Sequence, residues 1–484
     1  MAESHDVAII GAGFGGIGMA IALKQRGKHS LVILEKEGEV GGAWRDNTYP
    51  GAACDVPSRL YSFSFAKKFD WSRRFAPQAE IFAYLRQCAD DYGLHPHLRF
   101  NTEVEQARFD EAAGLWHIRT PHGEIHARVL ITATGQLNRP AWPSIPGRER
   151  FQGPAFHSAR WDHDVDLVGK TVAVVGTGAS AIQFVPEVAK QAKKVRLFQR
   201  SAAYVIPKPD RVYSSAEQKL MERMPLLQKL DRGRIYAQNE ARVLGFTAVQ
   251  SAMGFYQRLF KRYLKRCISD PQLREKLTPD YPLGCKRILI SNDYFQAIER
   301  YGIEVHTGGV GAITETGVVD AKGQHHEADV LIYGTGFQAT DFLAPMTILG
   351  REGRDLNDAW RDGAEAYLGI NVHGFPNMFM LYGPNTNLGH NSIVYMLESQ
   401  IAYVMSALEV LEQGGHRFMD VDADVQDRFN SDLQEQIRHT VWDKDCHSWY
   451  KTESGKNTNN WPGFTFTYRR RTQTLDTRDY ELSS

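Results

Sequence analysis

The sequence predicts an α/β protein with two dinucleotide-binding units and a helical insertion. A short apolar run, a glycine-rich turn and a helix-like segment follow one another twice, at residues 6–27 and 171–191. Strand, turn and helix in this order are typical of a Rossmann-like fold. Residues 212–280 instead place Leu, Met and Tyr at helical spacing with little glycine, which predicts the helical insertion.

The first unit lies at the N-terminus, where the run DVAII leads into GAGFGG. In such a turn Gly11 permits the tight bend, Gly13 lets the backbone approach a pyrophosphate, and Gly16 allows close packing of the helix on the strand. The next apolar run, LVILE, ends in Glu35, at the place where a dinucleotide fold binds a ribose. An N-terminal unit of this kind commonly binds FAD.

The second unit repeats the pattern, since TVAVV leads into GTGASA. Gly176, Gly178 and Ala181 occupy the three positions of the turn. The following strand ends in Arg200 and Ser201 instead of an acid. Arginine at this place suits a 2'-phosphate, which a carboxylate would repel, so this unit is expected to bind NADPH.

Two similar strand ends predict where the chain crosses between domains. Both VLITATGQ (129–136) and ADVLIYGTGF (328–337) are apolar runs that end in small residues. They divide the chain into a discontinuous FAD domain with the NADPH domain inserted in it. The expected segments are 1–138 (FAD domain, first part), 139–211 (NADPH domain, first part), 212–280 (helical insertion), 281–333 (NADPH domain, second part) and 334–484 (FAD domain, second part, with C-terminal helices and tail).

Composition limits the partners of the chain. Lys plus Arg and Asp plus Glu both count 57 in 484 residues, so no global field favours nucleic acid or an anionic membrane. The N-terminus lacks a signal peptide, and no stretch approaches the ~18 apolar residues of a transmembrane helix. We therefore expect a cytoplasmic enzyme of undetermined oligomeric state. The basic run 258–266 fits a solvated helix face better than a membrane or nucleic-acid surface.

The five cysteines are widely scattered and form no CxxC pair. This spacing indicates neither a disulfide framework nor a metal site, and it argues against a disulfide reductase.

Two gapped motifs resemble a known family. The stretch FQGPAFHSARWD matches Phe-x-Gly-x-x-x-His-x-x-x-Trp-Asp, and GGAWRDNTYPGAACD (41–55) matches a second pattern. Between residue 5 and about residue 470 the chain resembles the type I Baeyer-Villiger monooxygenases, which are related to flavin-containing monooxygenases. The matching residues of the first motif are Phe151, Gly153, His157, Trp161 and Asp162.

The resemblance implies an enzyme that uses FAD, NADPH and O2 to convert ketones to esters or lactones, through a C4a-peroxyflavin and a Criegee-type intermediate. It implies a mobile-loop role over the nicotinamide nucleotide for Trp449. The residues expected around FAD are Gly11, Gly13, Gly16, Glu35, Trp44, Asp55, Tyr61 and Val104. Those expected around NADPH are Gly176, Thr177, Gly178, Ala179, Ser180, Ala181, Gln183, Arg200, Ser201, Lys286 and Trp449.

The pair Lys286-Arg287 matches the family's Lys-Arg pair, in which the arginine enters the active site. Negative charge develops beside the flavin in this chemistry, so a permanent cation is needed there, and arginine stays charged at any workable pH. Arg287 is the candidate, and Asp55 would orient its guanidinium. The plainer alternatives are an interdomain salt bridge for Arg287 and a turn for Asp55.

Other interpretations remain open. The stretch LYGPNTNLGHNS (381–392) resembles flavin-containing monooxygenases, which oxygenate nitrogen or sulfur. A non-catalytic nucleotide-binding protein, or an NADPH oxidase or reductase, would also carry both units. Arg45-Asp46 and Ile288 depart from the pattern of many relatives. We expect Phe151 and Trp161 to pack into the junction of the two domains and His157 to hydrogen-bond across it, with a buried core histidine and direct catalysis as alternatives for His157.

Overall fold

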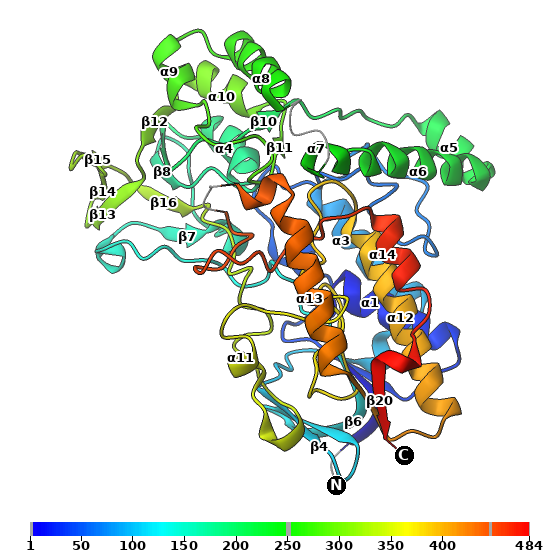
Figure 1. Ribbon diagram of the computed structural model, residues 1–484. Coiled ribbons are helices and arrows are strands. Elements are labelled where there is room, and N and C mark those ends of the chain that lie inside the picture. The colour runs from blue at the N-terminus through cyan, green and yellow to red at the C-terminus, as the bar shows by residue number, and fades with distance from the viewer. Residues whose placement is uncertain (1–2, 248–252, 445–447, 484) are drawn as a thin grey trace.

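The computed structural model describes residues 3–247, 253–444 and 448–483. The chain forms two lobes, each built on a sheet with parallel strands at its centre (Figure 1). The sheet of the larger lobe is eight-stranded. Its order is β17 (Thr347–Leu349), β4 (Gln106–Asp110), β5 (Leu115–Thr120), β6 (Gly123–Thr132), β1 (Glu3–Ile10), β2 (Leu31–Leu34) and β3 (Leu98–Arg99), and β18 (Met378–Met380) pairs with β6.

The apolar run of the first unit forms the centre of this sheet. β1 pairs in parallel with β2 and β6, where Ile9 lies opposite Ile33 and Ile131. Ile9 belongs to the core that contains residues of α1 (Phe14–Gln25), whereas Ile10 belongs to the core on the other face. Because both faces are covered, the strand is a continuous apolar run.

The sheet of the smaller lobe contains the second unit. Its five strands are parallel, and they run in the order β12 (Glu304–Thr307), β9 (Lys194–Gln199), β8 (Thr171–Val175), β16 (Val330–Tyr333) and β7 (Ala155–His157). Val174 packs into a core shared with Phe184 of α4 (Ala181–Ala189), and Val175 packs into the core on the opposite face. That opposite face carries a three-stranded antiparallel sheet of β13 (Val310–Thr314), β14 (Gly317–Asp320) and β15 (His325–Glu327).

Helices make up most of residues 212–280, as predicted. They are α5 (Ser215–Arg223), α6 (Pro225–Glu240), α7 (Val243–Thr247), α8 (Met253–Cys267) and α9 (Pro271–Lys276). The short strands β10 (Val205–Ile206) and β11 (Leu289–Ile290) pair on either side of this insertion, and α10 (Tyr294–Tyr301) follows it. The predicted α/β class with a helical insertion is therefore confirmed.

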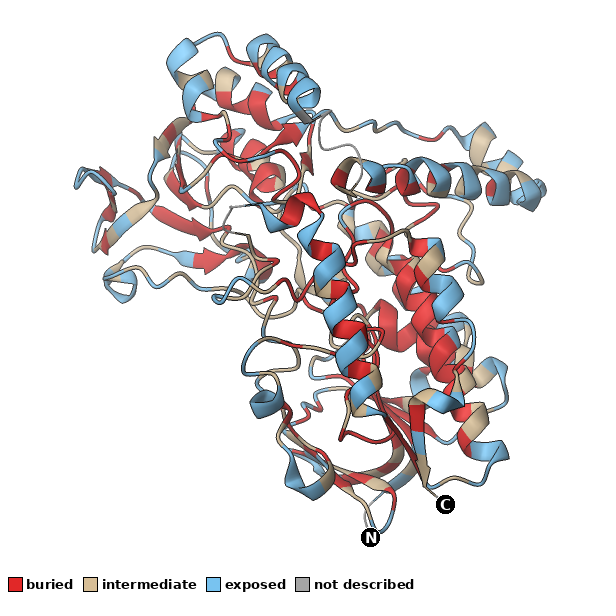
Figure 2. Cartoon of the chain, viewed as in Figure 1, coloured by how far each residue is buried: buried red, intermediate tan, exposed pale blue. Residues whose placement is uncertain are grey.

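The helix α12 (Ile393–Gln413) is the longest helix of the larger lobe and is mostly buried. It packs against α1 and α14 (Thr465–Arg471), and 67% of its most apolar window is buried (Figure 2). By length and composition α12 is able to span a membrane, so the expectation that no such stretch exists is wrong. Its burial identifies it as a core helix of the fold.

The remaining elements complete the larger lobe. They are α2 (Ala43–Asp46), α3 (Gln78–Asp91), α11 (Leu356–Ala359), α13 (Ala423–Arg438), and the antiparallel pair β19 (Phe418–Val421) and β20 (Tyr480–Ser483). Cys54, Cys88 and Cys267 are free thiols. Cys285 is disulfide-bonded, which the wide spacing of the cysteines did not predict.

Candidate active site

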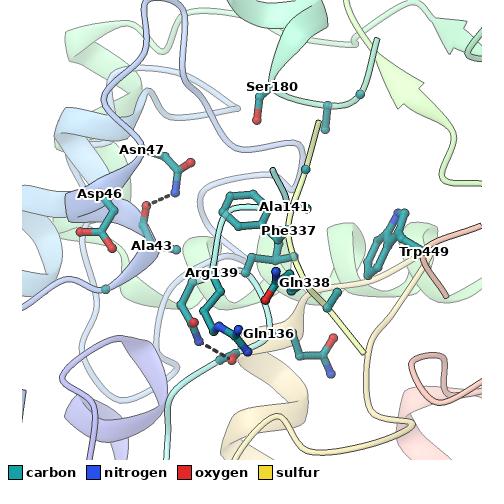
Figure 3. Close-up of a pocket in the computed structure, with 18 of the residues that line it drawn as sticks. Ala43, Asp46, Asn47, Gln136, Arg139, Ala141, Ser180, Phe337, Gln338 and Trp449 are labelled. Atoms are coloured by element: carbon teal, nitrogen blue, oxygen red, sulfur yellow. Dashed lines mark hydrogen bonds between the residues drawn. The ribbon is translucent and has the colours of Figure 1, made fainter. Parts of the chain in front are cut away.

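The candidate site is a cavity of about 1090 Å³ that is bordered by both glycine-rich turns. The turn after β1 and the turn after β8 line the same space, together with Arg287 and Asp55. Figure 3 shows Asp46 and Asn47 on one side of this cavity and Trp449 on the other. Two nucleotide-binding units therefore meet at a single site.

The two turns have the same geometry. The φ angles of Gly11 and Gly176 are +102° and +107°, a region that favours glycine. A Cβ atom on Gly11 would lie 2.7 Å from the carbonyl oxygen of Ala133, and one on Gly176 would lie 2.4 Å from that of Gly334. In both units the turn thus packs against a crossing segment, a stretch that leads from one lobe to the other. The two crossing segments are residues 133–142, which follow β6, and residues 334–338, which follow β16.

The turns leave room for a phosphate. A Cβ atom on Gly13 would meet only Gly42, at 3.8 Å, and one on Gly178 would meet only Gly334, at 3.9 Å. The helices that follow, α1 and α4, have no side-chain cap hydrogen bond at their N-caps, Gly13 and Ser180. Their first amides and their positive dipole ends are therefore available to an anion in the cavity.

The two strand ends carry opposite charge. The Oε2 atom of Glu35 accepts a hydrogen bond of 2.8 Å from the Ala12 amide, which holds the carboxylate beside the first turn. The Nη1 atom of Arg45 lies 3.3 Å from the Oε1 atom of Glu35. Arg45, which departs from the family pattern, therefore stabilises the negative charge of the Glu35 carboxylate. At the other strand end Arg200 is exposed. Beside it, Lys286 donates a 3.0 Å hydrogen bond to the Ser201 hydroxyl.

Arg287 and Asp55 form an ion pair in the cavity wall. The Nη2 atom of Arg287 donates to the Oδ2 atom of Asp55 at 2.5 Å, and each side chain is 31% exposed because it faces the cavity. The Asp55 charge raises the pKa of Arg287. Burial alone would raise the pKa of Asp55, but the charge of Arg287 and its hydrogen bond lower it. Both groups are therefore charged at neutral pH.

Other predicted residues also line the cavity. The indole nitrogen of Trp44 donates to the Tyr61 hydroxyl at 3.2 Å, and Tyr49 donates to the Oε1 atom of Gln183 at 2.9 Å. Trp449 packs on the ring of Tyr450, with 4.5 Å between ring centroids. The other predicted residues that line the cavity are Val104, Thr177, Ala179, Ser180, Arg200, Ser201 and Lys286.

Two of the residues predicted to bind a nucleotide do not line the cavity, Gly16 and Ala181. Both are buried in the first part of a helix, behind the turn. They act by packing, as the third position of each turn predicts.

The motif FQGPAFHSARWD lies outside the cavity. His157 ends β7, is fully buried, and accepts a 3.0 Å hydrogen bond from the Ala159 amide at Nδ1. Burial lowers the pKa of His157 to about 4, so it is neutral. Its ring contacts Trp142 and Phe337, which do line the cavity and belong to the two crossing segments.

The other motif residues pack or turn the chain. Trp161 packs on Phe184 of α4 at 5.4 Å between centroids, and Phe151 packs against the core beneath the three-stranded sheet. A Cβ atom on Gly153 would lie 2.4 Å from the Asp329 carbonyl oxygen. Asp162 accepts a hydrogen bond of 3.0 Å from the Asp164 amide.

Sequence reasoning missed the polar side chains of the crossing segments. Gln136, Arg139 and Gln338 line the cavity and are shown in Figure 3. A hydrogen bond joins the two crossing segments, since the Thr335 hydroxyl donates to the Ala141 carbonyl at 2.6 Å. The only signal was the small-residue turn that ends each preceding strand.

Comparison with known proteins identifies the class. Residues 8–251 match the family model described as pyridine nucleotide-disulphide oxidoreductase. The chain is 48% identical to a Baeyer-Villiger monooxygenase of Pseudomonas aeruginosa, over 100% of this chain and 92% of that protein. It is 45% identical to a Baeyer-Villiger monooxygenase of Streptomyces coelicolor, over 99% of this chain and 93% of that protein.

A solved structure supports the same assignment. The crystal structure of an OTEMO complex with FAD and NADP has a TM-score of 0.90 and 27% identity, and the match covers 100% of both chains. The two-unit fold and these relatives define a flavoprotein oxidoreductase of the monooxygenase type. The chain belongs to the Baeyer-Villiger monooxygenases, as the two motifs predicted.

Proposed function

We propose that this enzyme binds FAD and NADPH and uses O2 to convert ketones to esters or lactones. The observation that carries the proposal is the position of the Arg287–Asp55 pair, which lies in the same cavity as both glycine-rich turns. The relatives named above support the reaction type, and the OTEMO structure supports the pair of cofactors.

The first unit is the proposed FAD site. The uncapped N-terminus of α1 suits the pyrophosphate, and Glu35 suits the ribose hydroxyls. Trp44, Tyr61 and Val104 are proposed to border the same cofactor.

The second unit is the proposed NADPH site. The N-terminus of α4 suits the pyrophosphate, and the cations of Arg200 and Lys286 suit the 2'-phosphate. Trp449 is proposed to cover the nicotinamide nucleotide, and Gln183 joins this unit to the Ala53 carbonyl of the first by a 2.9 Å hydrogen bond.

Arg287 is the proposed catalytic cation. The flavin, when bound, supplies activated oxygen for insertion next to the carbonyl. The guanidinium of Arg287 stabilises negative charge that develops in the cavity, and it keeps its proton because Asp55 raises its pKa. Asp55 orients the guanidinium and balances its charge when no anion is present.

We also propose the domain division 1–138, 139–211, 212–280, 281–333 and 334–484. The pairing of β17 and β18 with strands of the N-terminal segment supports it. His157 is the proposed junction residue, because its ring makes edge contacts with the rings of Trp142 and Phe337. We propose a cytoplasmic location, which the burial of α12 supports.

Oxygenation of sulfur is the second candidate activity. Asn391, from the stretch shared with flavin-containing monooxygenases, lines the cavity. The side-chain amide of Asn391 donates a 2.6 Å hydrogen bond to Glu240, so a structural role also explains the presence of this stretch. A thioether among the substrates tested would reveal this activity beside ester formation.

The test is product analysis of the holoenzyme with linear, cyclic and aryl ketones. We expect ketone-stimulated NADPH oxidation with ester or lactone as product. Arg287→Ala should retain flavin and lose about 10²-fold or more in ester formation. His157→Ala should bind both nucleotides and consume NADPH with less ester formed.

Arg300→Ala is the matched control, because this exposed arginine lies in the last turn of α10 and does not line the cavity. It should leave the rate unchanged. Ester formation by Arg287→Ala at the unmutated rate would disprove the catalytic role, and sulfoxide without any ester would disprove the reaction type.

A further inference from the structure

Two histidines and an aspartate meet between the two sheets of the smaller lobe. His306 lies on β12, Asp320 ends β14, and His326 lies on β15. Their ligand atoms all lie within 4.8 Å of one another, and the two imidazole centroids are 4.2 Å apart. The sequence predicts no metal site, since these three residues are brought together only by the pairing of the strands.

The aspartate is held in one orientation. Its Oδ1 atom accepts hydrogen bonds from the amides of Lys322 and Gln324, at 2.9 and 3.0 Å. Its Oδ2 atom is left to face the imidazoles, and it lies 3.0 Å from the Nε2 atom of His326. Ligands of metal ions are commonly oriented by such outer hydrogen bonds.

The second imidazole has a nitrogen with no partner. The Nε2 atom of His306 is buried and makes no hydrogen bond among the described residues. The nearby carboxylate of Glu304 lies 3.9 Å away and is held by Lys194 and Arg196, at 2.6 and 2.9 Å. A buried polar atom without a partner is unfavourable, and a bound cation would satisfy it.

We propose that His306, Asp320 and His326 bind a divalent first-row transition ion such as Zn²⁺. Two imidazoles and one carboxylate suit this class of ion, and water or Glu304 would complete the shell. Ligand atoms around tetrahedral zinc are about 3.4 Å apart, so small side-chain rotations are sufficient to close the site.

The ion would act on structure and not on the reaction. None of its three ligands lines the cavity, although Phe198, which stacks on His306 at 4.8 Å, does. The ion joins the edge strand of the five-stranded sheet to the three-stranded sheet. This inference is independent of the proposed function.

A second cluster provides a matched comparison. His117, Glu124 and His126 also lie close together, on the β5–β6 hairpin. Here Glu124 is 50% exposed and already accepts from both imidazoles, at 2.9 and 2.7 Å. Neither histidine of this cluster has a buried nitrogen without a partner.

The test uses tag-free holoenzyme treated with a chelator and then dialysed against Zn²⁺ or Co²⁺. We expect about one tightly bound ion per chain by elemental analysis, a visible Co²⁺ absorption of low symmetry, and a thermal midpoint raised by a few degrees. His306→Gln and Asp320→Asn should abolish all three, whereas His126→Gln should retain them.

His306→Cys is a control for the possibility that the other variants lose the ion only because they unfold. It keeps a metal ligand, so it should still bind Co²⁺ and add a thiolate-to-cobalt charge-transfer band. Absence of a tightly bound ion in the unmutated protein, retention of the ion in His306→Gln, or binding without that band in His306→Cys would each overturn the proposal.

Discussion

The two nucleotide-binding units share a turn and differ at the strand that follows it. Gly11 and Gly176 pack in the same way against a crossing segment. The first unit then holds Glu35 buried beside its turn, whereas the second leaves Arg200 exposed at the cavity. We therefore propose that one backbone design serves two ligands and that the charge at a single strand end distinguishes them.

The third position of the turn is a further difference. A Cβ atom on Gly16 would lie 1.9 Å from the Gly11 carbonyl oxygen, whereas the second unit has Ala181 at the equivalent place. The first helix thus lies closer to its turn than the second. Four substitutions test these differences.

Gly16→Ala is expected to have the largest effect. The added methyl group would overlap a backbone carbonyl, which cannot rotate away, at a cost of about 3 kcal/mol. The protein should purify without flavin and unfold at a lower temperature, as measured by flavin absorbance and calorimetry. Unchanged flavin content and thermal midpoint would show that the first helix tolerates the geometry of the second.

Arg200→Gln should change the choice of nicotinamide nucleotide. Loss of a charge-assisted hydrogen bond to the 2'-phosphate should lower kcat/KM for NADPH by about 10- to 100-fold. NADH lacks this phosphate and is the internal control, with a value that should stay constant. An equal loss for both nucleotides would mean that Arg200 supports the fold of the strand end.

Lys286 should make NADPH binding sensitive to alkaline pH. Burial, together with the charge of Arg200, lowers the pKa of Lys286. Only the ammonium form attracts the phosphate, so affinity is full below this pKa and falls about fivefold as pH rises through it. Lys286→Arg should flatten the pH profile of KM for NADPH, and a steep profile in that variant would exclude Lys286 as its source.

Ala181→Gly should have the smallest effect. Removing the buried methyl group and freeing the backbone cost about 1 kcal/mol. Calorimetry should show a thermal midpoint lower by about 2 °C, with NADPH affinity retained. A loss as large as that of Gly16→Ala would mean that the third position is equally restrictive in both units.

Local patterns made both units predictable from the sequence. The strand, the turn, the helix and the charged residue at the next strand end lie within short distances along the chain. Their geometry follows from glycine conformation and apolar periodicity, so the sequence predicts opposite roles for Glu35 and Arg200.

The rest depends on contacts between distant segments. Asp55 and Arg287 belong to two separate family motifs, and only a charge argument links them, because no local pattern relates two residues so far apart. Gln136 and Gln338 lie in irregular crossing segments, where apolar periodicity carries no information. The cluster of His306, Asp320 and His326 depends on strand pairing, which neither the spacing nor the types of these residues reveal.

The strands β17 and β18 have a consequence for synthesis on the ribosome. They complete the larger sheet, yet they follow the whole smaller sheet in the chain. During synthesis, β4 and β6 of the N-terminal segment therefore lack the partners β17 and β18 while the inserted lobe is synthesised and folds. Truncated chains that end before β17 are for this reason candidates for aggregation, although they contain both glycine-rich turns.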